Sequence, residues 1–310
     1  MTTTPAPTGV EPADPAERRG TRVDGVDVLG ALSPSRVADF LNCPLQYRFR
    51  SIDRLPEPPS PAAVRGTVVH RVLEQLFDLP AAERTPERAE TMLEPAWAEL
   101  QEVEPAVASM FPEDGPEIVG WLASCREVLA RYFSLEDPRR LEPAERELYV
   151  ETLTDSKLLL RGVIDRVDVA PDGAIRVVDY KSGASPHVMF EAKALFQLRF
   201  YALVLWRMRG VVPKVLQLVY LGNSEVLTYE PDEQDLLATE RKVLAVWDAI
   251  RAATELREFQ PRKGAGCTWC SHQVRCPAYG GTPPPWPETE PEPDAAGEPV
   301  DVTGQPGPRG

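Results

Sequence analysis

Apolar residues recur at helical spacing in the N-terminal half of the chain. The first such stretch is SPSRVADFLNCPLQYRFR, where Ser33 can cap a helix and Pro34 suits its first turn. The same spacing, flanked by turn-like residues, returns over residues 63–78, 86–104 and 116–134. We therefore expect this half to be mainly helical.

The middle of the chain changes to short apolar runs that are rich in β-forming residues and bounded by turn residues. Residues 145–153, 157–169 and 174–183 predict three consecutive strands in a meander. The pattern then predicts a long helix, two strands and a last helix, over residues 187–210, 214–222, 225–230 and 231–257. Helices, a mixed sheet and more helices are typical of an α/β or α+β domain.

Two of the predicted strands carry acids among their aliphatic residues. In RGVIDRVDVAPDGAIRVVDYKSG, a turn at residues 171–173 would set Asp165 directly opposite Asp179. Opposed residues on one face have Cβ atoms about 4.5–5.5 Å apart, so two bare carboxylates would repel each other there. A divalent cation between them would turn this repulsion into a binding site.

Lys181 adds a cation to the same place. It lies two residues beyond Asp179, so strand alternation points both side chains to one face. Acids that hold a divalent metal, beside a lysine that positions or deprotonates water, suit the hydrolysis of a phosphodiester. By itself, the D-x-K pattern is equally compatible with a surface salt bridge.

Four segments in this order resemble the RecB-like nucleases of the PD-(D/E)xK type: GTVVHRVLEQLF, GVIDRVD, VVDYKSG and QLRFYAL. The resemblance spans residues 33–279 and implies a restriction-endonuclease-like core, an α/β fold whose mixed central sheet is flanked by helices. It also implies site residues. His70, Asp165 and Asp179 would bind Mg²⁺ or Mn²⁺ together with the backbone carbonyl of Tyr180, Lys181 would serve the attacking water, and Gln197 and Tyr201 would lie beside the substrate.

Two acids stand apart from the pattern of these relatives. Asp179 occupies a position where they often have Glu, so its carboxylate is one methylene shorter and could shift the metal. Glu147, in the first predicted strand, is a candidate for the outer shell of the site.

Four cysteines form the pattern C-(x223)-C-x2-C-x5-C, namely Cys43, Cys267, Cys270 and Cys276. In a cytosolic chain, clustered thiols more often bind metal than form disulfides, and four thiolates suit either zinc or an iron–sulfur cluster. Their spacing leaves both open. The family resemblance implies a [4Fe-4S] staple, with zinc as the alternative, while Cys125 is expected to be a small buried residue.

Composition sets the limits of the folded domain. The chain has 310 residues and a net charge of -14, with acidic, proline-containing ends that predict a disordered arm over residues 1–30 and a disordered tail over 281–310. The nuclease-like domain would then cover residues 31–280. No membrane-spanning run or signal peptide is present, so we expect a cytoplasmic protein without a membrane partner.

A nucleic-acid partner would need a local basic track on so acidic a chain. The candidates are Arg36, Arg48, Arg50, Arg54, Arg257, Arg262, Lys263 and Arg275, although each is also explained as an ordinary solvated charge.

The sequence thus predicts a metal-dependent DNA exonuclease for repair or recombination. We expect it to act on single strands or free ends, and the resemblance to the nuclease domains of recombination helicases implies a helicase or recombination partner. The chain has no GxxxxGK(S/T) phosphate-binding loop, so no ATP motor is visible in it. One alternative is a non-catalytic iron–sulfur DNA-binding accessory protein. Another is an iron–sulfur redox protein, against which the cysteines lack compact ferredoxin spacing.

Overall fold

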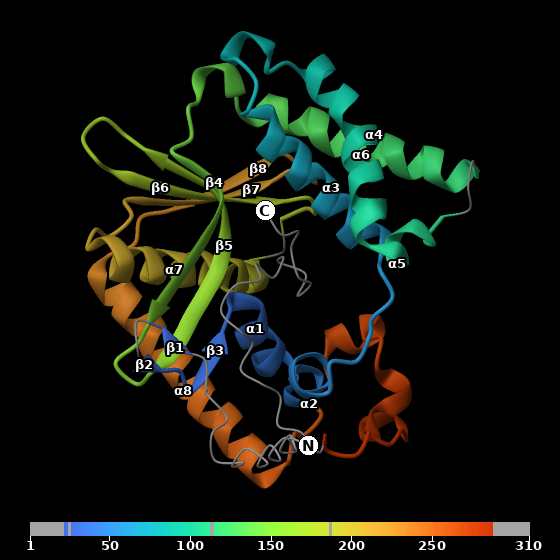
Figure 1. The fold of residues 1–310 in the computed structure, drawn as a ribbon, viewed down its shortest axis with the longest axis vertical. Helices are drawn as coiled ribbons and strands as arrows, with labels where there is room; N and C mark the ends of the chain where they lie inside the picture. Colours follow the sequence, from blue (N-terminus) through green and yellow to red (C-terminus); the bar gives the residue numbers. More distant parts are fainter. Residues whose placement is uncertain (1–21, 24–25, 112–114, 186–187, 288–310) are drawn as a thin grey trace, which may run out of the picture.

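The computed structural model describes residues 22–23, 26–111, 115–185 and 188–287. Figure 1 shows a central mixed sheet with helices packed on both faces, which is the predicted α/β architecture. Within the described ranges, none of the helices combines the length and the apolar character needed to cross a bilayer.

The main sheet has six strands in the order β3, β5, β6, β7, β8, with β4 paired to the other side of β5. The strands are β3 (Gly30–Leu32), β4 (Glu145–Leu153), β5 (Leu158–Val169), β6 (Ile175–Lys181), β7 (Val215–Tyr220) and β8 (Glu225–Tyr229). Strands β3 and β5, and strands β6 and β7, run parallel; the other pairs are antiparallel. The predicted meander β4–β5–β6 is confirmed. A separate short hairpin joins β1 (Arg22–Val23) to β2 (Val26–Asp27).

The helices begin where the sequence supplies proline and a capping side chain. They are α1 (Pro34–Asn42), α2 (Pro44–Tyr47), α3 (Pro61–Leu76), α4 (Pro86–Val103), α5 (Pro105–Ala108), α6 (Pro116–Leu135), α7 (Val188–Arg209) and α8 (Glu233–Leu256). Proline is the first residue of α1 to α6, where its fixed φ suits a helix and its missing N–H costs nothing. Ser33, Ser60 and Thr85 accept backbone hydrogen bonds at the starts of α1, α3 and α4.

Short helical segments complete the chain. A π-helical turn follows α2 at Arg48–Ile52, and 3₁₀ turns occur at Ala81–Glu83, Pro138–Arg140, Ala265–Trp269, Gln273–Arg275 and Pro277–Tyr279.

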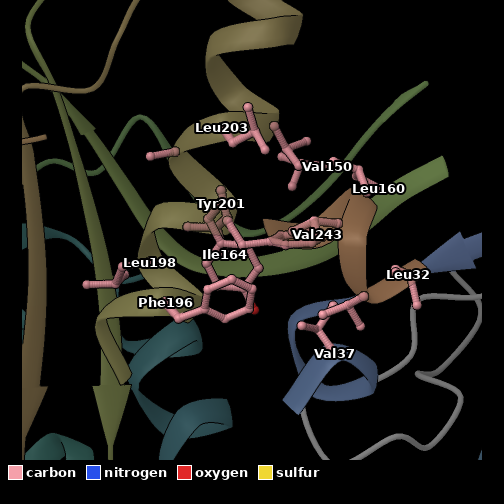
Figure 2. Packing of buried hydrophobic residues seen from close by; sticks show 14 of the residues in the cluster. Leu32, Val37, Val150, Leu160, Ile164, Phe196, Leu198, Tyr201, Leu203 and Val243 are labelled. Atoms are coloured by element: carbon pink, nitrogen blue, oxygen red, sulfur yellow. The ribbon is translucent and has the colours of Figure 1, made fainter. Parts of the chain in front are cut away.

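Two hydrophobic cores lie on opposite faces of the sheet. Helices α1, α7 and α8 pack on one face, and Figure 2 shows Val37, Tyr201 and Val243 from these helices meeting Leu32 and Ile164 from the strands. Helices α3, α4 and α6 cover the other face. A side chain at a gap in the sheet can therefore contact residues from both layers of helices.

The folded region extends further at both ends than the sequence suggests. Val28 is buried, and Leu29 donates its N–H to the Lys157 carbonyl at 3.0 Å, so this part of the predicted arm belongs to the domain. Beyond residue 280, Trp286 stacks on Phe259 with ring centroids 6.0 Å apart. The remaining parts of the two predicted disordered ends, residues 1–21, 24–25 and 288–310, lie outside the described residues.

Candidate functional site

The site lies where strands β5 and β6 separate. Their ladder has the predicted register and ends at the pair Arg166 and Val178, so Asp165 and Asp179 come directly after its last pair. On this edge, β5 pairs with β3 up to Leu160 and with β6 from Arg166 onward. A gap in strand pairing thus remains between the two partners, and Asp165 lies in it.

In this gap, the Asp165 carboxylate accepts a backbone hydrogen bond from β6 that a neighbouring strand would otherwise accept. Its Oδ2 atom accepts the backbone N–H of Tyr180 at 2.7 Å and lies 3.5 Å from His70 Nδ1. Only 6% of Asp165 is exposed, and burial raises the pKa of its carboxyl to about 6, with the Asp179 charge acting in the same direction. A bound cation would relieve this cost.

His70 reaches the gap from α3, on the other side of the sheet from α7. Its Nε2 atom lies 2.9 Å from the Tyr180 carbonyl oxygen. The Tyr180 side chain points into the α3 layer, where its hydroxyl bonds Arg166 and its ring packs against Tyr132. The main chain of Tyr180 is thereby fixed, with its N–H toward Asp165 and its carbonyl toward His70.

Asp179 belongs to a second hydrogen-bonded group, on the α7 side. Its Oδ2 atom lies 2.7 Å from Lys181 Nζ, and its Oδ1 atom accepts from Gln197 Nε2 at 2.9 Å. Gln197 also accepts from Lys181 Nζ at 2.8 Å and approaches the Tyr201 hydroxyl at 3.1 Å. The four predicted residues therefore form one connected network, with Gln197 and Tyr201 on one face of α7.

Glu147 lies closer to the site than the sequence suggested. Ligand atoms of His70, Glu147 and Asp165 all lie within 4.8 Å of one another, so the closest group of candidate ligands contains Glu147 and leaves Asp179 beside it. Glu147 has a φ of +42° in the middle of β4. The sequence signal was only an acid in a strand, because alternation does not reveal a left-handed residue.

At Glu147, the side chains of β4 change the face of the sheet to which they point. Arg146 donates to the Glu74 carbonyl of α3 at 2.6 Å, whereas Leu148, two residues later, packs against the α7 core. Side chains two apart normally share a face. The left-handed residue between them thus bends the strand and accounts for its departure from regular alternation.

This donor set fits a hard divalent cation. His70 Nε2 and the Tyr180 carbonyl oxygen are held side by side at the gap by a hydrogen bond of 2.9 Å. Buried carboxylate oxygens complete a set suited to Mg²⁺ or Mn²⁺.

The structure brings Cys43 to the three C-terminal cysteines. Cys43 Sγ accepts the N–H of Arg262, and Cys267 Sγ accepts the N–H of Gly264, both at 3.4 Å. This hydrogen bond from Gly264 is the main reason that the pKa of the Cys267 thiol lies below its ordinary value. Cys125 is fully buried in the α3–α6 core, as predicted.

Comparison with known proteins shows where this architecture recurs. The family model described as the PD-(D/E)XK nuclease superfamily matches residues 31–277. A crystal structure of a putative exonuclease from Eubacterium rectale aligns over 78% of this chain and 88% of its own, with a TM-score of 0.52 and 14% sequence identity. At that identity the likeness concerns the fold.

Two curated relatives have very different lengths. The Gene 69 protein of Mycobacterium phage D29 is 26% identical over 277 residues, which cover 80% of this chain and 96% of the phage protein. One subunit of the ATP-dependent helicase/deoxyribonuclease of Streptococcus equi subsp. zooepidemicus is 29% identical over 159 residues, covering 50% of this chain. The match spans 14% of that much longer streptococcal protein.

Proposed function

Because the chain belongs to the PD-(D/E)XK nuclease superfamily, we propose that it is a metal-dependent DNA exonuclease of the RecB-like type. The observation that carries the proposal is the meeting of two groups at one gap in the sheet. Ligand atoms of His70, Glu147 and Asp165 lie within 4.8 Å of one another, and Asp179, Lys181 and Gln197 form a hydrogen-bonded group beside them.

His70, Asp165, Asp179 and the Tyr180 carbonyl would hold Mg²⁺ or Mn²⁺, with Glu147 as a further ligand. The cation would neutralise phosphate charge and lower the pKa of a bound water. Burial of both aspartates excludes bulk water from the ligand oxygens, and the Tyr180 N–H keeps the Asp165 carboxylate oriented.

Lys181 would position or deprotonate the attacking water. Its Nζ atom bonds Asp179 and Gln197, so among the described residues one of its three N–H donors is left for a water or phosphate oxygen. Gln197 in turn fixes both partners, because its amide N–H bonds Asp179 and its amide oxygen accepts from Lys181. The network would thereby align the ammonium group before substrate arrives.

Single strands or free ends in DNA repair or recombination are the proposed substrates. The streptococcal helicase/deoxyribonuclease supports DNA as the substrate by its name and by its similarity to this chain. By the same comparison, a helicase is the proposed partner.

The four cysteines would hold a [4Fe-4S] cluster. The support for a four-thiolate site is that the fold brings Cys43 beside the C-terminal segment that carries the other three cysteines, since Cys43 Sγ accepts the N–H of Arg262. Four thiolates suit zinc as well as an iron–sulfur cluster, and the family resemblance favours the cluster.

Cleavage of end-labelled single-stranded and duplex DNA, with Mg²⁺, Mn²⁺ or EDTA, tests the function. We expect metal-dependent release of short products from ends, and a loss of at least ~100-fold in Asp179→Asn and Lys181→Ala. Asp172→Asn is the matched control, since Asp172 lies in the turn of the same hairpin and only caps Ala174.

Two results would contradict parts of this proposal. Full activity in Asp179→Asn would contradict the catalytic role of Asp179 and its network. DNA binding by the wild type without cleavage under any metal would instead identify a DNA-binding accessory protein.

A further inference from the structure

The C-terminal segment, residues 259–287, differs in charge from the rest of the chain. It contains no Asp or Glu, yet it carries Arg262, Lys263 and Arg275 in a protein whose net charge is -14. A cationic segment on an acidic protein attracts polyanions to that segment, because the rest of the surface repels them.

Two of these cations are available to a ligand. Lys263 and Arg275 are exposed, and neither forms an ion pair with an acid within the described part of the chain. Arg262 is exposed as well, but its guanidinium donates to the Leu41 carbonyl and so helps to anchor the segment. The early half of the predicted basic track behaves differently. Arg48 is buried against Asp53 at 3.0 Å, and Arg50 bonds Glu57 and Asp39 at 2.8 and 2.7 Å, so those two arginines are structural.

The same segment exposes large apolar side chains. Trp269 is 88% exposed, Val274 83% and Tyr279 50%. Trp and Tyr usually bury most of their rings, so a solvated Trp beside cations is typical of a binding surface. Lys263 Nζ lies 5.0 Å from the centre of the Tyr279 ring, which places charge and ring together.

The segment that presents these groups is anchored to the domain. His272 is buried, with Nε2 2.7 Å from Glu57 Oε1 and its ring 5.3 Å from that of Phe49. Arg48 donates to the Pro284 carbonyl at 2.6 Å. The backbone that carries the exposed rings is therefore fixed before a ligand arrives, which lowers the entropy cost of binding.

The anchor also places the segment near the metal site. Glu57 lies four residues before the start of α3 at Pro61, and Figure 1 shows the segment beside α2 and the loop that leads into α3. His70 follows nine residues into α3, about 14 Å along the helix axis from Pro61. The anchor at Glu57 and the metal site therefore lie on one short, continuous stretch of chain.

We propose that Trp269 and Tyr279 stack the bases of a single-stranded nucleic acid while Lys263 and Arg275 contact its phosphates. The surface would hold the strand next to the cleavage site, so the inference rests on the proposed nuclease function and names the part of the chain that selects single strands. Aromatic faces with nearby cations bind all bases, which suits a nuclease without sequence preference.

Binding of fluorescein-labelled oligothymidylate in EDTA, followed by anisotropy, tests the surface without cleavage. Trp269→Ala should weaken binding about 10-fold or more, and Trp269→Phe should retain most of it. Lys263→Gln and Arg275→Gln should each lower the slope of log affinity against log salt by about 0.7. Leu256→Ala is the matched control, since Leu256 is an exposed apolar residue of α8.

The outcomes separate this inference from the nuclease proposal. Unchanged binding by Trp269→Ala, or no binding by the wild type, overturns the surface even where metal-dependent cleavage is present. Loss of binding in Trp269→Ala, with unchanged circular dichroism, supports the surface even where the wild type cleaves nothing. A wild-type dimer that Trp269→Ala dissociates, with oligothymidylate binding intact, would assign the patch to self-association and overturn the proposal.

Discussion

At the scale of single residues, Glu147 combines a charge with an unfavourable backbone. Its φ of +42° belongs to the left-handed region, which costs a residue with a Cβ roughly 1–2 kcal/mol. Such strain persists where surrounding structure enforces it, and here it accompanies a carboxylate within 4.8 Å of His70 and Asp165 ligand atoms.

Two substitutions separate the charge of Glu147 from its strain. Glu147→Gln keeps the shape and the strain, whereas Glu147→Asn introduces a residue that tolerates the left-handed region. Both should weaken metal activation of cleavage, measured as the Mn²⁺ concentration for half-maximal rate. In thermal unfolding with EDTA, Glu147→Asn should be the more stable of the two, by up to about 1 kcal/mol; equal stability would count against backbone strain at this position.

Asp165 shows what a sequence can and cannot reveal about a residue. The turn at residues 171–173 sets the register, because Gly173 supplies a positive φ and Asp172 caps Ala174, so the position of Asp165 and Asp179 just beyond the last pair of the ladder was predictable. The predicted direct pairing of the two aspartates is not formed, because the ladder ends before them. The direction of the Asp165 carboxylate was not. It depends on the gap between β3 and β6, and a three-residue parallel strand such as β3 leaves almost no periodic signal.

At the scale of elements, strand β5 and helix α7 approach closely at Gly162. A Cβ at this position would lie 2.7 Å from Tyr201 Cε1. The absence of a side chain on the strand thus lets the Tyr201 ring lie close enough for its hydroxyl to reach Gln197 at 3.1 Å.

Gly162→Ala should therefore push Tyr201 and the Gln197 network away from Asp179. We expect a loss of about 1–3 kcal/mol in the free energy of unfolding, together with slower cleavage. Gly120→Ala in α6 is the opposite case, since nothing lies within 4 Å of its Cβ position, and it should stabilise by up to about 1 kcal/mol. Chemical denaturation of both variants measures their free energies of unfolding. A Gly162→Ala variant that is as stable and active as the wild type would show that α7 can shift away from β5 without loss of stability.

The helices and strands themselves were largely predictable, for physical reasons. Long elements such as α7 and α8 carry many periodic positions, and prolines with capping residues mark where α1, α3 and α4 begin. The short elements were missed. Strand β3 and the π-helical turn at Arg48–Ile52 owe their conformation to contacts with distant parts of the chain rather than to a local pattern.

At the scale of the whole molecule, the cysteines connect the first helices to the last described residues. Cys43 Sγ accepts a hydrogen bond from the N–H of Arg262, which lies 219 residues later in the sequence. A cluster at these thiols would restrict the unfolded chain, so its loss should cost stability as well as cofactor.

Cys43→Ala tests this connection. Protein prepared without oxygen should be brown and contain iron and sulfide, and the variant should lose its colour and unfold at a lower temperature. Cys125→Ala is the control, because Cys125 is buried away from the other thiols and its loss should leave the visible absorption intact. Stoichiometric zinc in the wild type, with no iron, would contradict the cluster.

A group of packed aromatic rings joins residues near the start of the domain to residues near its end, and this has a consequence for the chain while it is being synthesised. Phe40 and Tyr47 pack on Phe259, which in turn stacks on Trp286. A ribosome makes the first two rings long before their partners, so a nascent or prematurely terminated chain ending before Phe259 carries these rings uncovered. Truncated translation products should therefore be the aggregating species, and they would be cleared by proteolysis while the finished chain persists.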